Sequence, residues 1–327
     1  MYITGQIVHP GCSTTPELGK FFNAPPAAKS RNETQETGSH RNQGGFSAVK
    51  QVLRRYVERL PAPLPVLTQD AFRYVRYAKI RKEGRIRREI LRKTQWSGEI
   101  AQGPFRGMRY SLNSYGSTIL PKLFGTYESE LAPTIEAIAV SGCDKIVDIG
   151  AAEGYYAVGL ALRVPEIPLV GFEMSSSARY YLRRLIRLNG VEDRIEIRGE
   201  CNADSLAEVL EWPERPVVIC DCEGAEDFLL DPERVPALQR SWILVETHDD
   251  IVAGVSERLR ERFHETHDIE VIRNQPRTRA DLPAGFDFSA EEVAEAVEEY
   301  RSWAEWLFMR PKASEKSARE PKASIGS

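Results

Sequence analysis

The chain has 327 residues, of which 42% are hydrophobic and 28% are charged, enough for one large α/β domain with an appendage. A formal net charge of −4 argues against a generally basic nucleic-acid-binding protein. No stretch approaches the roughly 20 apolar residues that cross a bilayer, and the N-terminus has no basic flank followed by an apolar core. We therefore expect a soluble protein of the cytoplasm, with no transmembrane segment.

The five cysteines are odd in number and lie in apolar surroundings, which argues against a disulfide framework. Cys220 and Cys222 flank Asp221, but a zinc site would need further thiol or imidazole ligands at comparable spacing. The sequence offers none, so we expect reduced cysteines without zinc.

The composition changes along the chain and divides it into four parts. Residues 1–45 are rich in small and polar residues without apolar periodicity, and residues 311–327 are similar, so we expect disorder at both ends. Residues 46–122 predict a basic helical extension, with helices at 47–60 and 69–93 and a short β segment near 107–112. Residues 123–310 predict the main domain.

The helix at 69–93 is the most basic segment, and two interpretations of it are open. Clustered cations on one helix face can bind nucleic acid or another polyanion. Alternatively, the helix is a solvated surface whose cations meet acidic side chains near the other end of the chain. Those acidic side chains are Glu291, Glu292, Glu295, Glu298 and Glu299.

Helical and strand patterns alternate through the main domain, which predicts a doubly wound, mostly parallel α/β sheet. The predicted helices are 128–140, 155–163, 176–188, 205–210 and 255–263, and Asn189-Gly190 supplies a left-handed cap for the third of them. The predicted strands are 145–149, 168–173, 194–198, 217–221, 242–247, 268–272 and 303–309.

The first of these strands runs into a glycine turn with the pattern D-x-G-x-A-x-G, formed by Asp148, Gly150, Ala152 and Gly154. A dinucleotide-binding turn would need glycine in place of Ala152 and Tyr155, so the spacing excludes that ligand class. Glycine lets a ligand approach the backbone closely, and a side chain at Gly150 should therefore block binding. Asp148 either contacts the ligand or caps the turn.

Two further positions are candidates for holding a nucleoside. Glu173 ends the next strand, where nucleotide-binding folds place an acid that accepts hydrogen bonds from ribose hydroxyls. Asn202 and Asp204 follow the third strand, and either could contact a base or cap the helix after it. Both readings of Asn202 and Asp204 remain open.

Polar side chains also end the fourth and fifth strands. Asp221 and Glu223 follow one of these strands, and Glu246 and His248 end the other. Because adjacent parallel strands end at the same edge of a sheet, these four side chains should converge. His248 could act as a general base, with Asp221 as a second candidate, or it could simply bond to a neighbouring carboxylate. Alternatively, Asp221, Glu223 and Glu246 could hold a divalent ion such as magnesium.

The glycine turn resembles the first motif of S-adenosylmethionine (SAM) dependent methyltransferases. Three further stretches occur in the order and spacing of FkbM-like methyltransferases, and the resemblance covers about residues 103–309. These stretches are Gly125-Thr126-Tyr127-Glu128, Asp221-Cys222-Glu223-Gly224-Ala225-Glu226 and Leu244-Val245-Glu246-Thr247-His248.

The resemblance implies a seven-stranded Rossmann-like methyltransferase sheet whose seventh strand is antiparallel, and transfer of a methyl group from SAM to a hydroxyl of a small molecule or carbohydrate. It places Tyr127 and Glu128 over the methionine end of SAM. The implied cofactor-binding residues are Tyr127, Glu128, Asp148, Gly150, Ala152, Gly154, Glu173, Asn202 and Asp221, and the implied catalytic residues are His248, Asp221, Glu223 and Glu246. Two alternatives remain: an RNA methyltransferase that uses the basic helices, and a non-catalytic binding protein.

Overall fold

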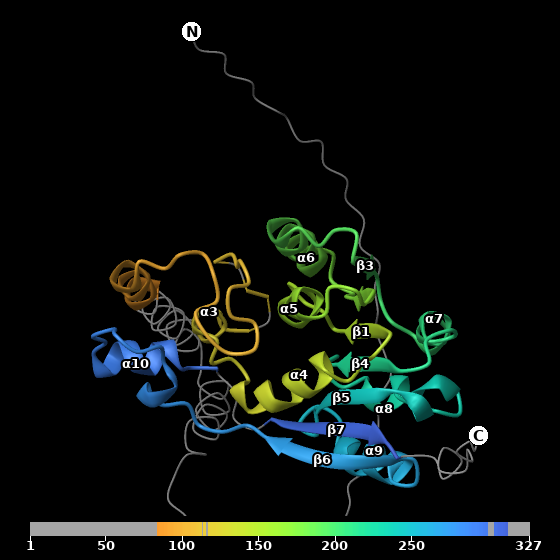
Figure 1. Cartoon of the computed structure of the whole chain (residues 1–327). Coiled ribbons are helices and arrows are strands. Elements are labelled where there is room, and N and C mark those ends of the chain that lie inside the picture. Colours follow the sequence, from red (N-terminus) through yellow and green to blue (C-terminus); the bar gives the residue numbers. More distant parts are fainter. Residues whose placement is uncertain (1–83, 113, 116, 300–303, 313–327) are drawn as a thin grey trace, which may run out of the picture. The chain divides into compact units, whose positions relative to one another are not determined.

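Seven strands form one sheet in the computed structural model, which describes residues 84–112, 114–115, 117–299 and 304–312 (Figure 1). These residues belong to one unit, Asp70–Ser327. The expectations for residues 1–45, the helix at 47–60, most of the helix at 69–93 and nearly all of the tail lie outside the described residues. The four-part division of the chain remains a prediction.

The sheet has the predicted doubly wound order. Its strands are β1 (Lys145–Ile149), β2 (Leu169–Phe172), β3 (Ile195–Arg198), β4 (Pro216–Cys220), β5 (Trp242–Thr247), β6 (His267–Arg273) and β7 (Glu305–Pro311). They are arranged as β3-β2-β1-β4-β5-β7-β6. The neighbours from β3 to β5 pair in parallel, while β7 is antiparallel to both β5 and β6. The antiparallel seventh strand is therefore confirmed.

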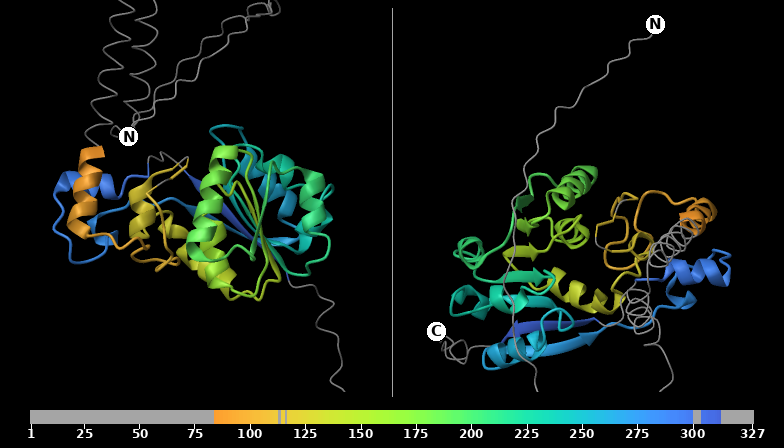
Figure 2. Two further views of the ribbon diagram at one scale, coloured as in Figure 1. Left: turned by 90° about the horizontal axis from the view of Figure 1, so that it is seen from above. Right: turned by 180° about the vertical axis from the view of Figure 1, so that it is seen from behind.

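Helices cover both faces of the sheet because alternate strand residues point to opposite sides. In β1, Ile146 joins the core beneath α4 (Ala132–Ala139), α5 (Tyr155–Arg163) and α6 (Ser176–Asn189). Val147 and Ile149 join the second core, with α7 (Ala203–Val209), α8 (Glu226–Leu229) and α9 (Val255–Phe263). Figure 2 (left) shows α5 and α6 on one side of the strands and α7 and α8 on the other.

A group of shorter elements lies beside the sheet on the side of the first core. It contains α3 (Ile119–Phe124), α10 (Ala290–Ala296) and the helical residues 84–94. Ion pairs join Arg87 to Glu295 (3.3 Å) and Lys93 to Glu292 (2.7 Å). The described end of the basic helix thus meets acidic partners from α10, as one of the two interpretations expected.

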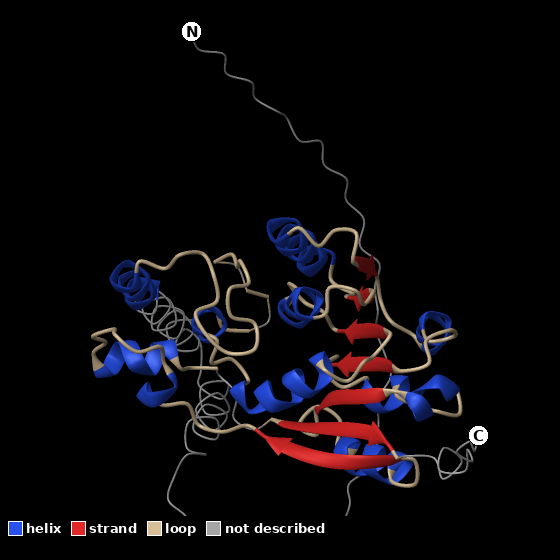
Figure 3. Cartoon of the chain, in the orientation of Figure 1, coloured by secondary structure: helices blue, strands red, loops and turns tan. Residues whose placement is uncertain are grey.

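Three differences from the predicted elements have a local cause in the structure. The helix predicted at 128–140 begins only at Ala132, after the short 3-10 helix η1 (Ser129–Leu131), because Glu128 has a left-handed backbone with φ 47°. The β segment near 107–112 is only an isolated bridge between Glu99 and Arg109, in a stretch drawn as loop in Figure 3. The helix predicted at 205–210 begins at Ala203 because Asn202 caps it.

The loop before α3 packs against α5 through a close contact at Gly159. A Cβ placed on Gly159 would stand 2.5 Å from the ring of Phe105, which is buried against Tyr155 and Tyr156. The loop can lie here only because α5 has no side chain at that position.

We expect Gly159→Ala to lower the free energy of unfolding by about 1–3 kcal/mol, because overpacking outweighs the helix propensity of alanine. Urea unfolding would measure this change. Gly84→Ala is the control, since its nearest atom, Arg88 Nη1, is 3.8 Å away, and it should be neutral or stabilising by up to about 1 kcal/mol. Equal stability changes in the two variants would contradict the contact.

Candidate active site

A cavity of about 1150 Å³ lies at the carboxyl ends of the parallel strands, where ligands bind in open α/β sheets. Nine of the residues predicted to form the site line this cavity. These are Tyr127, Asp148, Gly150, Ala152, Glu173, Asp221, Glu223, Glu246 and His248. Three predicted site residues, Glu128, Gly154 and Asn202, do not line the cavity.

Gly150 and Gly154 are needed for close packing within the protein, whether or not a ligand approaches the turn. A Cβ on Gly150 would stand 1.7 Å from the backbone oxygen of Asp221, and one on Gly154 would stand 2.5 Å from Leu182 Cδ1. Both residues also have positive φ, 85° and 102°. The expectation that a side chain at Gly150 would block a ligand is therefore a poor test, because that side chain would first displace the end of β4.

Backbone amides of the turn already have acceptors. Gly150 N and Ala151 N both donate to the oxygen of Phe172 at 2.9 Å, and Gly154 N donates to the oxygen of Ala151 at 2.7 Å. Ala152, which has a left-handed backbone with φ 46°, donates its N–H to Glu173 Oε2 at 2.9 Å. The turn is thus held by its own hydrogen bonds and does not present these amides to a phosphate.

Asp148 is a buried carboxylate that lines the cavity. Only 3% of its surface is exposed, and its Oδ2 has no hydrogen-bond partner among the described residues. Burial, together with the negative charge of Asp221, raises the pKa of Asp148 to about 7. A cation or hydroxyl donor in the cavity would satisfy this oxygen and restore the ionised form.

Glu173 stands at the end of β2, as predicted, and it organises the turn. Its Oε2 accepts the hydrogen bond from Ala152, and its Oε1 accepts one from Ser175 N at 2.6 Å, just before α6. Each carboxylate oxygen has a second lone pair, so both can still accept from a ligand. A ribose contact at Glu173 stays a prediction.

Asn202 adopts the capping arrangement that was one of its two interpretations. Its side-chain oxygen accepts from Ser205 N at 2.9 Å, and Ser205 Oγ accepts from Asn202 N at 3.0 Å. This reciprocal pair begins α7. A base contact by Asn202 is untested, and a side chain already engaged in a cap is less available for it.

Tyr127 and Glu128 form a buried turn after α3. The ring of Tyr127 contacts the edge of Tyr155 at 5.3 Å between centroids, and Lys122 Nζ lies 4.8 Å from the Tyr127 ring centroid. Glu128 accepts a hydrogen bond from the hydroxyl of Tyr156. Tyr127 therefore forms part of the cavity wall, while the Glu128 side chain supports that wall from behind.

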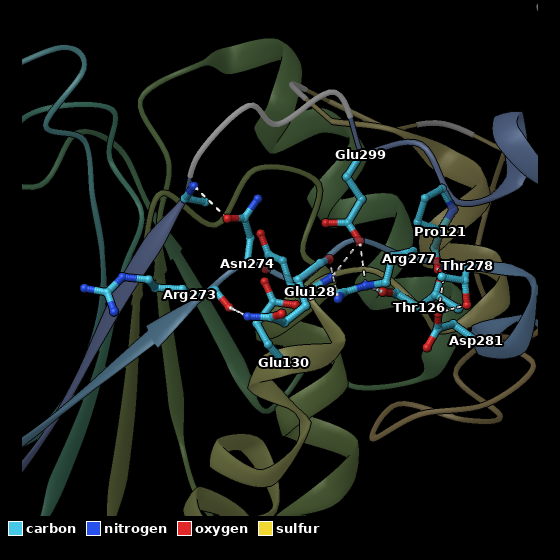
Figure 4. Close-up of polar contacts among 12 residues, drawn as sticks. Pro121, Thr126, Glu128, Glu130, Arg273, Asn274, Arg277, Thr278, Asp281 and Glu299 are labelled. Carbon is cyan, nitrogen blue, oxygen red and sulfur yellow. Dashed lines mark hydrogen bonds and ion pairs between the residues drawn. The ribbon is translucent and has the colours of Figure 1, made fainter. Parts of the chain in front are cut away.

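Arg277 anchors the same turn from the segment that follows β6 (Figure 4). Its Nε donates to the oxygen of Thr126 at 3.0 Å and pairs with Glu299 at 3.3 Å, and its Nη2 pairs with Glu130. Glu299 also accepts from Glu128 N at 3.3 Å. Arg277 was not predicted from the sequence, because Thr126, Glu130 and Glu299 all lie more than twenty residues away from it along the chain.

A second buried ion pair lies close to Tyr127 in the cavity wall. Lys122 Nζ lies 2.5 Å from Glu153 Oε1, and each side chain is 3% exposed. Burial alone would raise the pKa of Glu153, but Lys122 outweighs it and the pKa is lowered. Glu153 also accepts from the Tyr110 hydroxyl and from Tyr115 N, so one carboxylate ties the preceding loop to the glycine turn.

His248 lies among four carboxylates at the ends of β4 and β5. Its Nδ1 is 2.6 Å from Glu226 Oε1, and its Nε2 is 3.5 Å from Glu223 and 3.6 Å from Asp221. Glu246 is the fourth carboxylate, 4.0 Å from Nε2. Glu226 is fully buried, and the sequence analysis quoted it in a motif without assigning it a role.

The charge of His248 follows from this setting. Burial lowers the pKa of a histidine, but the hydrogen bond to Glu226 and the charges of Glu246 and Asp221 outweigh it and raise the pKa to about 9. In the ligand-free protein His248 is therefore an imidazolium at neutral pH. It must lose that proton before it can act as a base, so its predicted catalytic role remains untested.

One group of metal-ligating type occurs among the described residues. Asp221, Glu223 and His248 each offer one ligand atom, and these atoms lie within 4.8 Å of one another. The ion-binding set expected from the sequence contained Glu246 instead of His248. The atoms close enough to share one ion come from His248, Asp221 and Glu223, and Glu246 is not among them.

One cation of the basic helix reaches the cavity wall within the described part of the chain. Arg87 lines the cavity, and its Nε is buried without a hydrogen-bond partner, while its Nη2 pairs with Glu295. The remaining cations in residues 84–94 do not line the cavity.

Comparisons with known proteins give only structural likenesses. No protein-family model matches the sequence, and no curated protein matches it. Similar solved structures include a precorrin-6y C5,15-methyltransferase from Geobacter metallireducens, with 15% identity, a TM-score of 0.39, and coverage of 57% of this chain and 88% of that one. An O-methyltransferase from Bacillus cereus in complex with SAH has 15% identity, a TM-score of 0.38, and coverage of 54% and 78%.

A third similar structure is the M1A22 tRNA methyltransferase TrmK from B. subtilis, with 12% identity, a TM-score of 0.36, and coverage of 59% and 69%. Identities and scores this low assign no particular activity to this chain. Within the described residues, no helix combines the length and apolar character needed to span a membrane.

The raised pKa of Asp148 predicts a pH-dependent stability. The unfolded carboxyl has a pKa near 3.9 and the folded one about 7, so the folded state holds an extra proton between these values and stability falls as the pH rises through this window. Asp148→Asn removes this loss. We expect the variant to be more stable than the unsubstituted protein at pH 8, by at most about 4 kcal/mol, with a smaller gain at pH 5.

Urea unfolding of the ligand-free protein at the two pH values would measure this difference. The exposed Asp204, in the first turn of α7, provides the matched control, because its carboxyl is not buried and Asp204→Asn should not stabilise the protein at pH 8. A gain for Asp148→Asn of the same size at pH 5 and pH 8 would contradict the assignment.

Proposed function

We propose that the protein is a SAM-dependent methyltransferase that methylates a hydroxyl of a small molecule or carbohydrate. The observation that supports this most directly is the charge of the cavity. Nine carboxyl groups line it, and among the described residues the basic side chains on its wall are Arg87, Lys122 and His248. The carboxyl groups belong to Asp148, Glu153, Glu173, Glu200, Asp221, Glu223, Glu246, Asp250 and Glu299. Such a cavity favours a cationic ligand and disfavours a phosphate.

SAM matches this environment because it carries a sulfonium and an ammonium group but no phosphate. Asp148, whose buried Oδ2 has no hydrogen-bond partner among the described residues, suits the ammonium, and Glu173 suits the ribose hydroxyls. Tyr127 would cover the methionine end. The occupied amides of the turn argue against a dinucleotide, in agreement with the glycine spacing.

The size of the cavity supports a second ligand beside the cofactor. Its volume of about 1150 Å³ exceeds the range of about 300–1,000 Å³ that is typical of pockets for one small molecule. Methyl transfer from a sulfonium is an in-line displacement, so the protein has to align donor and acceptor and accept the hydroxyl proton. We assign proton removal to the cluster of Asp221, Glu223, Glu246 and His248.

An RNA acceptor receives less support from the described residues. Arg87 and Lys93 of the basic helix are already paired with Glu295 and Glu292, so their charges are partly compensated. A salt-sensitive RNA complex that is lost on neutralising the exposed Arg85 and Arg88 would favour the RNA alternative.

Glu173→Gln should weaken SAM binding at least about tenfold, because the amide cannot accept hydrogen bonds from both the ribose and the backbone. Isothermal calorimetry with SAM would measure the affinity. Glu192→Gln is the matched control, since Glu192 is an exposed carboxylate just before β3, at the opposite ends of the strands. No SAM binding by the unsubstituted chain would remove the proposed function.

His248→Ala should lower the rate of methyl transfer by about 100-fold or more while leaving SAM affinity within a factor of a few. Transfer of labelled methyl groups to fractionated small molecules provides the rate, and calorimetry provides the affinity. If SAM affinity and rate fall together, His248 has a structural role only.

A further inference from the structure

Three side chains converge where two neighbouring strands, β4 and β5, end at the cavity. Asp221 follows β4 and His248 follows β5, and these strands pair in parallel, so they end at one edge. Glu223, whose backbone is left-handed at φ 57°, turns its carboxylate back toward the His248 ring. We propose that Asp221, Glu223 and His248 together bind one divalent transition-metal ion.

The separations of the ligand atoms fit a shared ion. Atoms bound to one metal at about 2.0–2.2 Å lie at most about 4.4 Å apart. The three atoms here lie within 4.8 Å of one another. His248 Nε2 is 3.5 Å from Glu223 Oε2 and 3.6 Å from Asp221 Oδ1, so only a small inward movement of exposed or half-exposed carboxylates is needed.

The distances from His248 Nε2 to the neighbouring carboxylates are longer than ordinary hydrogen bonds. Hydrogen bonds from nitrogen to oxygen have lengths of about 2.7–3.2 Å, and the 3.5 Å, 3.6 Å and 4.0 Å from Nε2 to Glu223, Asp221 and Glu246 all exceed that range. One N–H could in any case serve only one of the three carboxylates. An ion bound to His248 Nε2 and to the carboxylates of Asp221 and Glu223 would contact all three ligands.

Glu226 is the independent observation that supports the site. This carboxylate is fully buried, its Oε1 holds His248 Nδ1 at 2.6 Å, and its Oε2 has no hydrogen-bond partner among the described residues. Histidines that bind metals almost always donate their other ring nitrogen to a carboxylate, a carbonyl or water. Glu226 therefore orients the ring so that Nε2 faces the two ligand carboxylates.

The ligand set indicates the class of ion. Magnesium and calcium prefer sites built entirely of oxygen, whereas imidazole suits iron, nickel, copper and zinc, and carboxylates also suit manganese. Two carboxylates and one imidazole leave further positions open for water or a ligand oxygen. The paramagnetic Mn²⁺ ion is consequently the probe of choice.

The catalytic consequence rests on the proposed function, but the binding of the ion does not. A bound cation at this position would supply positive charge beside the acceptor hydroxyl and ease its loss of a proton. The His248 nitrogen would then serve as a ligand rather than as the base.

Titration of the full-length protein with Mn²⁺, followed by electron paramagnetic resonance in the absence of SAM and acceptor, tests the site. We expect one Mn²⁺ per chain, with affinity lowered at least about tenfold in Asp221→Asn and in His248→Gln. Glu226→Gln should lower affinity by about tenfold through the orientation of the ring. Asp250→Asn is the matched control, because Asp250 is an exposed acid on the same cavity wall outside the ligand set, and it should bind Mn²⁺ normally.

Thermal unfolding of each variant separates loss of a ligand from loss of the fold. If the unsubstituted protein binds no Mn²⁺ at millimolar concentration, or if Asp221→Asn binds it as well as the unsubstituted protein does, the site is overturned. SAM binding measured on the same samples keeps the two proposals apart. Cofactor binding without Mn²⁺ would overturn only the metal site, and Mn²⁺ binding without SAM would overturn only the methyltransferase.

Discussion

The contact between Gly150 and the backbone oxygen of Asp221 is the constraint on which the rest of the site depends. No Cβ fits between them, since it would stand 1.7 Å from that oxygen. Because the backbones meet here, Asp148 at the end of β1 and Asp221 after β4 lie close enough for the charge of one to raise the pKa of the other. The contact thus brings two of the acidic side chains of the cavity close together.

Two buried ion pairs then hold the walls of the cavity around that contact. Lys122 with Glu153 ties the loop before α3 to the glycine turn, and Arg277 with Glu130 ties the segment after β6 to the turn at Tyr127. Breaking a buried pair by removing one partner typically costs about 3–5 kcal/mol, because the remaining charge is left uncompensated. Loss of one partner from either pair would therefore lower the stability of the protein substantially. Both pairs join segments that are distant in the chain.

The predicted elements were accurate where the local sequence pattern was strong. β1, β5, α5 and α9 have the bounds that apolar periodicity and glycine predicted. The start of the helix expected at residue 128 was wrong because the left-handed backbone of Glu128 is sustained by buried tertiary contacts, including the bond from its N–H to Glu299. Local propensity carries no information on such contacts.

The sequence by itself determined the order of the strands along the chain, the acids and histidine at their ends, and the mismatch with a dinucleotide motif, because these depend on spacing and on side-chain chemistry within short stretches. The tertiary structure alone decided that the two glycines serve backbone and helix packing, that Glu226 orients His248, and that Arg277 and Glu153 hold the walls. These features arise from contacts between segments remote in sequence, and no local pattern encodes which distant side chain fills a given space.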